Sequence, residues 1–250
     1  MADARAHIRR RAGLRLWLSA TWLGLLVLGA VLAPWIAPQD PLAQDLFLGR
    51  LPPVWVLGTE PGYYLGTDSL GRDVLSRILH GARVALIVAL VAGTLTCLIG
   101  ATLGLLAGFL RGWVDVVISR AIDIWMAFPP VLFSILLIAV MGPGLWSIII
   151  AIVVIDWTRF ARVVRAEAMA QGAMDYVASA QVAGRKRLST MVTEILPNVL
   201  PTIVVLLTLE MGIAVIVEAI LSFVNLSIST DDPTWGGMIA EGRTSIHQAW

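Results

Sequence analysis

Long apolar runs alternate with short polar segments along this chain of 250 residues. Each run approaches or exceeds the roughly 20 residues that a helix needs to cross about 30 Å of hydrocarbon. We therefore predict an all-α, polytopic membrane protein with about five spanning helices. The predicted spans are 16–36, 82–109, a third that follows a tight turn at 111–113 and ends near 141, then 145–164 and 199–223.

Two features inside the predicted spans bear on their packing. Gly100, Gly104 and Gly108 recur every four residues, and such a stripe of small residues lets another helix approach closely. Pro129 and Pro130 interrupt the third run, and we expect a kink there. The spans are thus expected to pack closely, with one irregular helix among them.

The segment 37–81 differs in composition from the apolar runs that flank it. It contains several prolines, glycines and acidic residues, which indicates an irregular loop. Within it, "LGTDSLGRDVLSRILHGAR" (65–83) places Asp68 and Asp73 where helix-capping residues stand, and 74–80 has the pattern of a short helix. We accordingly divide the chain into a basic tail and first helix (1–37), an extracytoplasmic loop (38–81) and a transmembrane domain (82–250).

Composition and charge exclude a soluble domain and set an orientation. The chain is 58% hydrophobic and 14% charged, with a mean hydropathy of +0.84, and its net charge of +1 gives no field that attracts nucleic acid. Under an alternating topology, 13 of the 18 lysines and arginines fall on one side of the membrane. The positive-inside rule makes that side, with the N-terminus, cytoplasmic. A cleaved signal peptide is disfavoured because the run 16–36 is long and Pro34 would follow the cut.

The segment 175–201, "DYVASAQVAGRKRLSTMVTEILPNVLP", is polar and basic and lies between two apolar runs. It is long enough for two short helices around Gly184, and its charge places it in the cytoplasm. A helix–glycine–helix element at the membrane surface can seat in the groove of a partner and pass the partner's movement to the adjoining spans. The alternative is a basic anchor at the lipid headgroups.

Acidic residues within the predicted spans are candidates for a functional site, since a charge inside a membrane is costly. Glu210 and Glu218 lie eight residues apart, about 80° around a helix, and either could line a solute pathway or bond to a second subunit. Asp123, and Asp156 three residues before Arg159, are expected to pair with nearby arginines. The main alternative function is therefore an ion-coupled secondary transporter or channel subunit that uses Glu210, Glu218 and Asp123.

The sequence contains no recognisable catalytic or metal-binding set. Its single lysine, Lys186, lacks the glycine spacing of a phosphate-binding loop, so the sequence offers no recognisable site for nucleotide hydrolysis. His7, His80 and His247 lack the spacing of metal ligands, and no Ser–His–Asp set supports a membrane-bound enzyme. Cys97, the one cysteine, is interpreted as a packing residue. We expect no metal and no cofactor in this chain, and no enzymatic activity.

Four motifs then occur in order along the chain. They are "LGTDSLGRDVLSRILHGARVAL" (65–86), "RAIDIWMAFP" (120–129), "DWTRFARVVRAEAM" (156–169) leading to "ILPNVLP" (195–201), and "EAILSF" followed by "PTWGGMIAEGR" (218–243). Together they resemble the second, C-type, inner-membrane permease subunit of dipeptide, oligopeptide and nickel ABC importers, from about Leu14 to the end. The resemblance implies the type I ABC importer transmembrane fold and half of a translocation pathway for peptides or similar small solutes.

The resemblance also implies partners and site residues. The partners are a sister permease, two cytoplasmic ATPases that bind ATP and Mg, an extracytoplasmic solute-binding protein and membrane lipid, with no nucleic acid. The ATPase-coupling loop 175–197 takes its named residues from the family pattern E-A-A, three residues, G, then I-x-L-P: Asp175, Tyr176, Ala180, Gly184, Ile195, Leu196 and Pro197. The extracytoplasmic motif comprises Gly66, Asp68, Gly71, Arg72 and Asp73.

Two of the chain's departures from the family pattern bear on its partners and its number of spans. Ala178, Ser179 and Ala180 stand where Glu-Ala-Ala is usual, so one contact to the ATPase is expected to be missing. The family has a sixth span after the segment "WGGMIAEGR", whereas this chain stops at Trp250, where that span should begin. A truncated C-terminal span is therefore expected.

Overall fold

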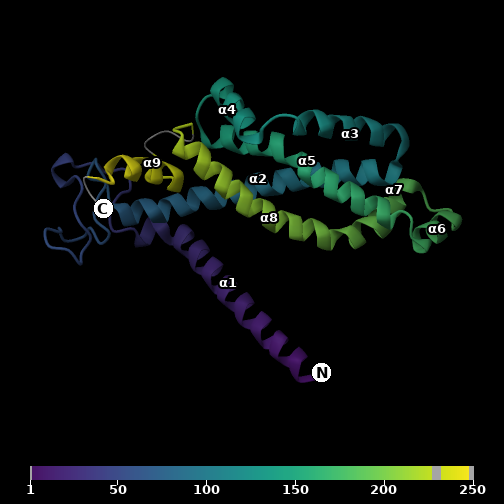
Figure 1. The fold of residues 1–250 in the computed structure, drawn as a ribbon, viewed down its shortest axis with the longest axis horizontal. Helices are drawn as coiled ribbons and strands as arrows, with labels where there is room; N and C mark the ends of the chain where they lie inside the picture. Colours follow the sequence, from purple (N-terminus) through teal and green to yellow (C-terminus); the bar gives the residue numbers. More distant parts are fainter. Residues whose placement is uncertain (1, 227–231, 248–250) are drawn as a thin grey trace. The chain divides into compact units, whose positions relative to one another are not determined.

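The computed structural model describes residues 2–226 and 232–247, whose regular secondary structure is helical, with no β-strand among them (Figure 1). The predicted all-α class is confirmed. The helical elements are α1 (Ala2–Ile36), η1 (Leu46–Leu48), α2 (Val74–Leu110), α3 (Gly112–Met126), α4 (Pro130–Met141), α5 (Leu145–Gln171), α6 (Asp175–Val182), α7 (Arg187–Thr190), the π-helical turn η2 (Met191–Ile195), α8 (Leu196–Phe223) and α9 (Trp235–Ser245).

The chain forms two compact units. The first comprises Met1–Leu86 and Thr230–Trp250, and it contains α1, the irregular loop, the beginning of α2 and α9. The second comprises Ile87–Ser229, and it contains the rest of α2 and the helices from α3 to α8. The extracytoplasmic motif therefore lies in the first unit and the coupling loop in the second.

Close contact between α2 and α5 builds the core of the second unit, where these helices run along α8 (Figure 1). A Cβ atom on Gly104 would lie 2.7 Å from the carbonyl oxygen of Ala161, and one on Gly108 would lie 2.9 Å from the Cβ of Ala168. The glycine stripe thus lets two backbones touch, as predicted. The buried residues around this contact are Cys97, Ala101, Leu105, Phe160, Val164, Ala168, Val177, Ile195, Val199 and Ile203.

The start of α2 differs from the prediction. The segment 74–80, predicted as a separate short helix, is the beginning of a single helix that continues to Leu110. Asp73 caps this helix, because its Oδ2 accepts a hydrogen bond of 2.8 Å from the N–H of Ser76. Gly81 lies inside α2 without breaking it, and a Cβ there would lie 2.8 Å from Cδ1 of Trp235 in α9. The local pattern predicts the cap but not how far the helix extends.

The two prolines break the third predicted span completely, where a kink was expected. α3 ends at Met126 and α4 begins at Pro130, with an angle of 87° between them. Pro129 adopts φ −62° and ψ 121°, because the residue before a proline is disfavoured in helical conformation. Pro130 then starts the next helix at a position where its missing N–H costs nothing.

Length and apolarity identify three of the described helices as candidate membrane spans: Gly13–Ile36, Val74–Leu110 and Arg187–Phe223. The bent pair of α3 and α4 is a fourth if it counts as one span. α5 occupies the predicted span 145–164, but its second half carries Asp156, Arg159 and Arg162. The five predicted spans are thus present as helical segments, and three or four of them are long and apolar enough to cross a bilayer.

The glycine stripe leads to a prediction about stability. Gly104→Ala places a methyl group against backbone that cannot move aside, so α2 and α5 must separate. We expect a loss of about 1–3 kcal/mol, seen as a lower thermal unfolding midpoint in detergent.

Gly212→Ala in α8 is the matched control, since a Cβ there meets nothing within 4 Å. Alanine favours helix at such a site, so its midpoint should be unchanged or higher. Equal midpoints for the two variants would contradict the close contact.

Candidate functional site

The coupling loop (175–197) forms the helix–glycine–helix element that its sequence predicts, between the end of α5 and the beginning of α8 (Figure 1). Gly184 has a φ of 83°, in the left-handed region that favours glycine. Its N–H donates to the carbonyl of Gln181 (3.0 Å), and that of Arg185 donates to the carbonyl of Ala180 (3.1 Å), which closes the end of α6. A Cβ at Gly184 would meet nothing within 4 Å, so the backbone angle selects glycine here.

Side-chain hydrogen bonds tie the coupling loop to the helices on either side. The hydroxyl of Tyr176 donates to Oε1 of Gln171 at the end of α5 (2.8 Å), and Nδ2 of Asn198 in α8 donates to the same hydroxyl (3.4 Å). Arg185 donates to Oγ1 of Thr193 (2.6 Å). Burial raises the pKa of Tyr176, so its hydroxyl keeps its proton. Tyr176 therefore connects the loop to both α5 and α8.

The coupling-loop residues predicted from the sequence differ in burial. Ile195 is buried, Tyr176, Ala180 and Leu196 are half-buried, and Asp175 and Pro197 are exposed. Val177 and Ile195 belong to the core between α2, α5 and α8, so the loop is part of the folded unit. An open hollow on the loop is lined by Tyr176, Ala180, Ala183, Gly184, Arg185 and Glu194.

Three apolar side chains of the coupling loop were missed from the sequence. Val182 is 89% exposed, Leu188 60% and Val192 53%. Val182 precedes the basic residues 185–187, and the other two apolar residues follow them. Three exposed apolar side chains on one short segment make the loop a candidate surface for another protein or for lipid. Val182 could have been noticed from the sequence, because it is an apolar residue at the predicted end of a helix, in a segment that is otherwise polar.

Buried charges hold the extracytoplasmic motif to α9 within the first unit. Arg72 is 2% exposed; its Nε donates to Oδ2 of Asp68 (2.6 Å), and its Nη2 donates to both carboxylate oxygens of Glu241 (2.9 Å each). Burial acts to lower the pKa of Arg72, but the hydrogen bond and charge of Asp68 and the charge of Glu241 together raise it above its usual value. Arg72 is therefore a permanent cation between two carboxylates. Glu241 was not predicted as a site residue, although it lies in a quoted motif.

Two glycines give the extracytoplasmic motif its tight path. Gly66 and Gly71 both have a φ of 77°, and a Cβ on either would collide with loop backbone, at Leu51 and Asp45 respectively. Both positions therefore require glycine for conformation and for space. The structure thus brings the five predicted residues of this motif into one local arrangement: Gly66, Asp68, Gly71, Arg72 and Asp73.

Two buried carboxylates share one arginine between α5 and α8. Glu210 is 2% exposed and Asp156 6%. Nη2 of Arg159 lies 3.2 Å from Oδ1 of Asp156, and its Nη1 lies 3.5 Å from Oε2 of Glu210. The predicted pairing of Asp156 with Arg159 is confirmed, and the structure adds Glu210 to it. This cluster links the two helices that flank the coupling loop.

The other two acidic candidates lie elsewhere in the second unit. Glu218 is 1% exposed and accepts a hydrogen bond of 2.5 Å from the hydroxyl of Ser222. Asp123 in α3 is 57% exposed and lies 3.9 Å from Arg120 and 3.5 Å from Arg162 of α5. Its predicted pair with Arg120 is confirmed. The structure therefore does not gather the three acids into one site, and a role for them in a solute pathway stays a prediction.

Among the described residues, no group of three or more His, Cys, Asp or Glu side chains could hold a metal ion.

Comparison with known proteins finds similarity over most of the chain. The family described as "Binding-protein-dependent transport system inner membrane component" matches residues 100–246. The di/tripeptide transport system permease protein DppC of Pseudomonas aeruginosa is 38% identical over 226 residues, which cover 90% of this chain and 75% of that protein. The dipeptide permease DppC of Haemophilus influenzae is 37% identical over 225 residues, with coverages of 90% and 76%. The glutathione permease GsiD of Pectobacterium atrosepticum is 35% identical over 243 residues, with coverages of 97% and 76%.

The buried cluster of α5 and α8 leads to a second prediction. Arg159→Gln leaves the carboxylates of Asp156 and Glu210 without their shared cation. We expect a loss of roughly 1–3 kcal/mol in the free energy of unfolding, measured as a lower thermal midpoint.

Arg120→Gln serves as the control, because Arg120 is 78% exposed and its pair with Asp123 is long. It should leave the midpoint unchanged. An unchanged midpoint in Arg159→Gln would show that the cluster does not hold the helices together.

Proposed function

Since this chain belongs to the family of binding-protein-dependent transport system inner membrane components, we propose that it forms half of a pathway for short peptides in an ATP-driven importer. Membership makes the chain a permease subunit of an ABC importer, a transport component of the membrane. The solute class rests on the relatives, whose names give di/tripeptides, dipeptides and glutathione as their solutes. These solutes share a peptide bond and a free carboxylate.

The coupling loop is proposed to dock on a cytoplasmic ATPase. The observation that carries this proposal is the element α6–Gly184–α7, bonded to α5 and α8 through Tyr176 and exposing Val182 and Leu188. Such an element fits a groove in a partner through its exposed apolar side chains, and its fixed ends transmit movement. The chain's sequence has no phosphate-binding loop, so the ATPase is proposed as a separate subunit that binds ATP and Mg.

The proposed membrane orientation is supported by the distribution of charge. Segments proposed to face the cytoplasm, including the N-terminal tail and the coupling loop, carry 13 of the 18 lysines and arginines. We propose a cytoplasmic N-terminus in the cell inner membrane. The loop before α2, together with α9, then faces outward, where a solute-binding protein would dock.

A sister permease is proposed to complete the pathway. α8 exposes apolar side chains at Val204, Val205, Leu209 and Ile216, while Glu210 and Glu218 are buried within the chain itself. The exposed face suits lipid or a second permease. The burial of both glutamates favours a part in holding α8 in place, and it weighs against the ion-coupled alternative, in which they would meet a passing ion.

The test of this function is uptake by the complete importer in proteoliposomes, measured together with ATP hydrolysis. Gly184→Val forces a β-branched residue into the left-handed region, which costs roughly 1–2 kcal/mol and strains the turn. We expect dipeptide uptake to fall several-fold more than ATP hydrolysis, because the loop would no longer pass movement to α5 and α8.

Gly184→Asn is the matched control, since asparagine tolerates a positive φ. It should retain most of the uptake. Uptake that is unchanged in Gly184→Val would refute the coupling role. Uptake that is lost when the proton gradient is dissipated, and that does not depend on ATP, would favour the ion-coupled alternative.

A further inference from the structure

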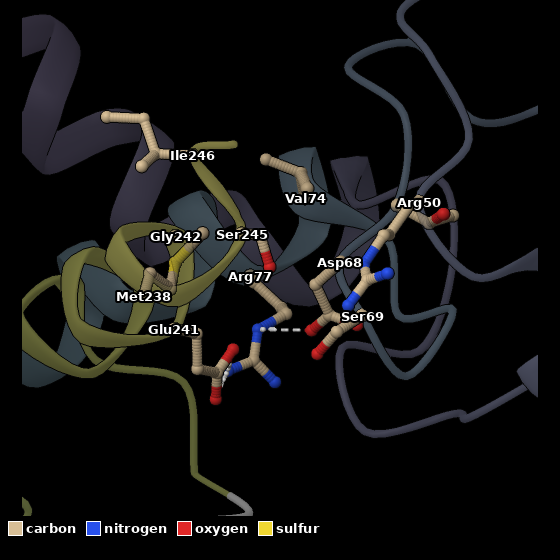
Figure 2. A pocket seen from close by; sticks show the side chains of 11 residues that line it. Arg50, Asp68, Ser69, Val74, Arg77, Met238, Glu241, Gly242, Ser245 and Ile246 are labelled. Atoms are coloured by element: carbon tan, nitrogen blue, oxygen red, sulfur yellow. Dashed lines mark hydrogen bonds and ion pairs between the residues drawn. The ribbon is translucent and has the colours of Figure 1, made fainter. Parts of the chain in front are cut away.

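A cavity of about 310 Å³ lies between the extracytoplasmic loop and α9, within the first unit (Figure 2). Its volume is at the lower end of the range typical of small-molecule sites. Arginine and carboxylate side chains line one part, and Val74, Met238 and Ile246 line another. The cavity therefore offers charge and apolar surface together.

Arg77 is the unusual member of this lining. It is 2% exposed, yet neither its Nε nor its Nη1 has a hydrogen-bond partner among the described residues. Its Nη2 donates only long hydrogen bonds, of 3.4 and 3.5 Å, to the carboxylate oxygens of Glu241, and its Nε lies 3.6 Å from Oδ2 of Asp68. Figure 2 shows its guanidinium between these two carboxylates. A buried guanidinium with open donors is costly unless an acceptor meets it.

The neighbouring carboxylates meet Arg77 only at long distances, because their short hydrogen bonds are made to Arg72. Asp68 and Glu241 make their short hydrogen bonds, of 2.6 and 2.9 Å, to Arg72. Asp73 caps α2 and is not part of the lining. Arg50 reaches the cavity as a further cation, so the guanidinium groups of Arg50 and Arg77 line it together with the carboxylates of Asp68 and Glu241. What remains unsatisfied is the pair of open donors on Arg77, which lie in a planar fork that matches a carboxylate.

We propose that this cavity binds the free carboxylate of a short peptide, with Arg77 and Arg50 as the carboxylate-binding residues and the apolar wall taking the adjoining side chain. The inference rests on the proposed function, since it takes the solute to be a peptide on the outer side. It assigns a solute contact to residues outside the five of the extracytoplasmic motif. An acidic side chain of a docked binding protein is the rival occupant, but a cavity of this volume with a buried donor suits a small ligand better.

The test is calorimetric titration of the permease–ATPase complex in nanodiscs, without ATP and without the binding protein. The probes are alanyl-alanine and its C-terminal amide, which lacks the carboxylate. We expect alanyl-alanine to bind at least about tenfold more tightly than the amide. Failure of alanyl-alanine to bind, or equal binding of the two probes, overturns the proposal.

Variants locate the site. Arg77→Lys keeps the charge but loses the planar fork, and it should weaken alanyl-alanine binding at least about tenfold. Arg50→Gln changes an exposed residue, so it leaves the fold intact and should weaken binding about threefold. Arg83→Gln, an exposed arginine of α2 outside the cavity, is the control and should bind as the unaltered complex does.

Two outcomes separate this inference from its premise. If Arg77→Lys and Arg50→Gln leave alanyl-alanine binding unchanged while Gly184→Val still uncouples uptake, the cavity proposal fails and the proposed function stands. If these variants weaken docking of the binding protein instead of peptide binding, the cavity takes a protein side chain and the proposal is likewise overturned.

Discussion

The contact between the backbones of α2 and α5 is the interaction on which the second unit depends. Apolar side chains gain nothing from burial when lipid surrounds them, so helices in a membrane associate through close packing and hydrogen bonds. The glycine stripe provides that closeness, with Gly104 against the backbone at Ala161 and Gly108 against Ala168. Once α5 is fixed on α2, Arg159 is held where it reaches both Asp156 and Glu210, and α8 is held in turn.

The same contact between α2 and α5 also anchors the coupling loop. Val177 of α6 and Ile195 before α8 are buried in the core that the glycine stripe builds. The loop is therefore packed against the helical core and is not held by its two ends alone. It packs against α2, α5 and α8, while Val182 and Leu188 are exposed. The proposed docking on an ATPase would therefore act on a segment that is packed into the helical core.

Local patterns predicted the features that local chemistry decides. The turn at Gly184, the cap at Asp73 and the pair of Asp156 with Arg159 each involve residues a few positions apart, and each is found. The break at Pro129 was underestimated, because two consecutive prolines remove more helical backbone than one.

Contacts between distant segments were not predicted. Glu241 bonds to Arg72 across 169 residues, and Glu210 lies in a different helix from Arg159. No period or motif in the sequence specifies which buried charges meet, because that depends on how the helices pack. The cavity beside Arg77 was missed for the same reason.

The most direct test of the central claim, that the coupling loop docks on a cytoplasmic ATPase, is site-directed cross-linking in the assembled importer. Cys97 is the chain's one cysteine and is buried, so Cys97→Ala gives a background without thiols in this subunit. The account predicts that Val182→Cys in that background cross-links to the ATPase, while Leu57→Cys, 98% exposed in the extracytoplasmic loop, does not. Labelling of Val182→Cys by an impermeant thiol reagent added outside intact cells, with no cross-link to the ATPase, would contradict it.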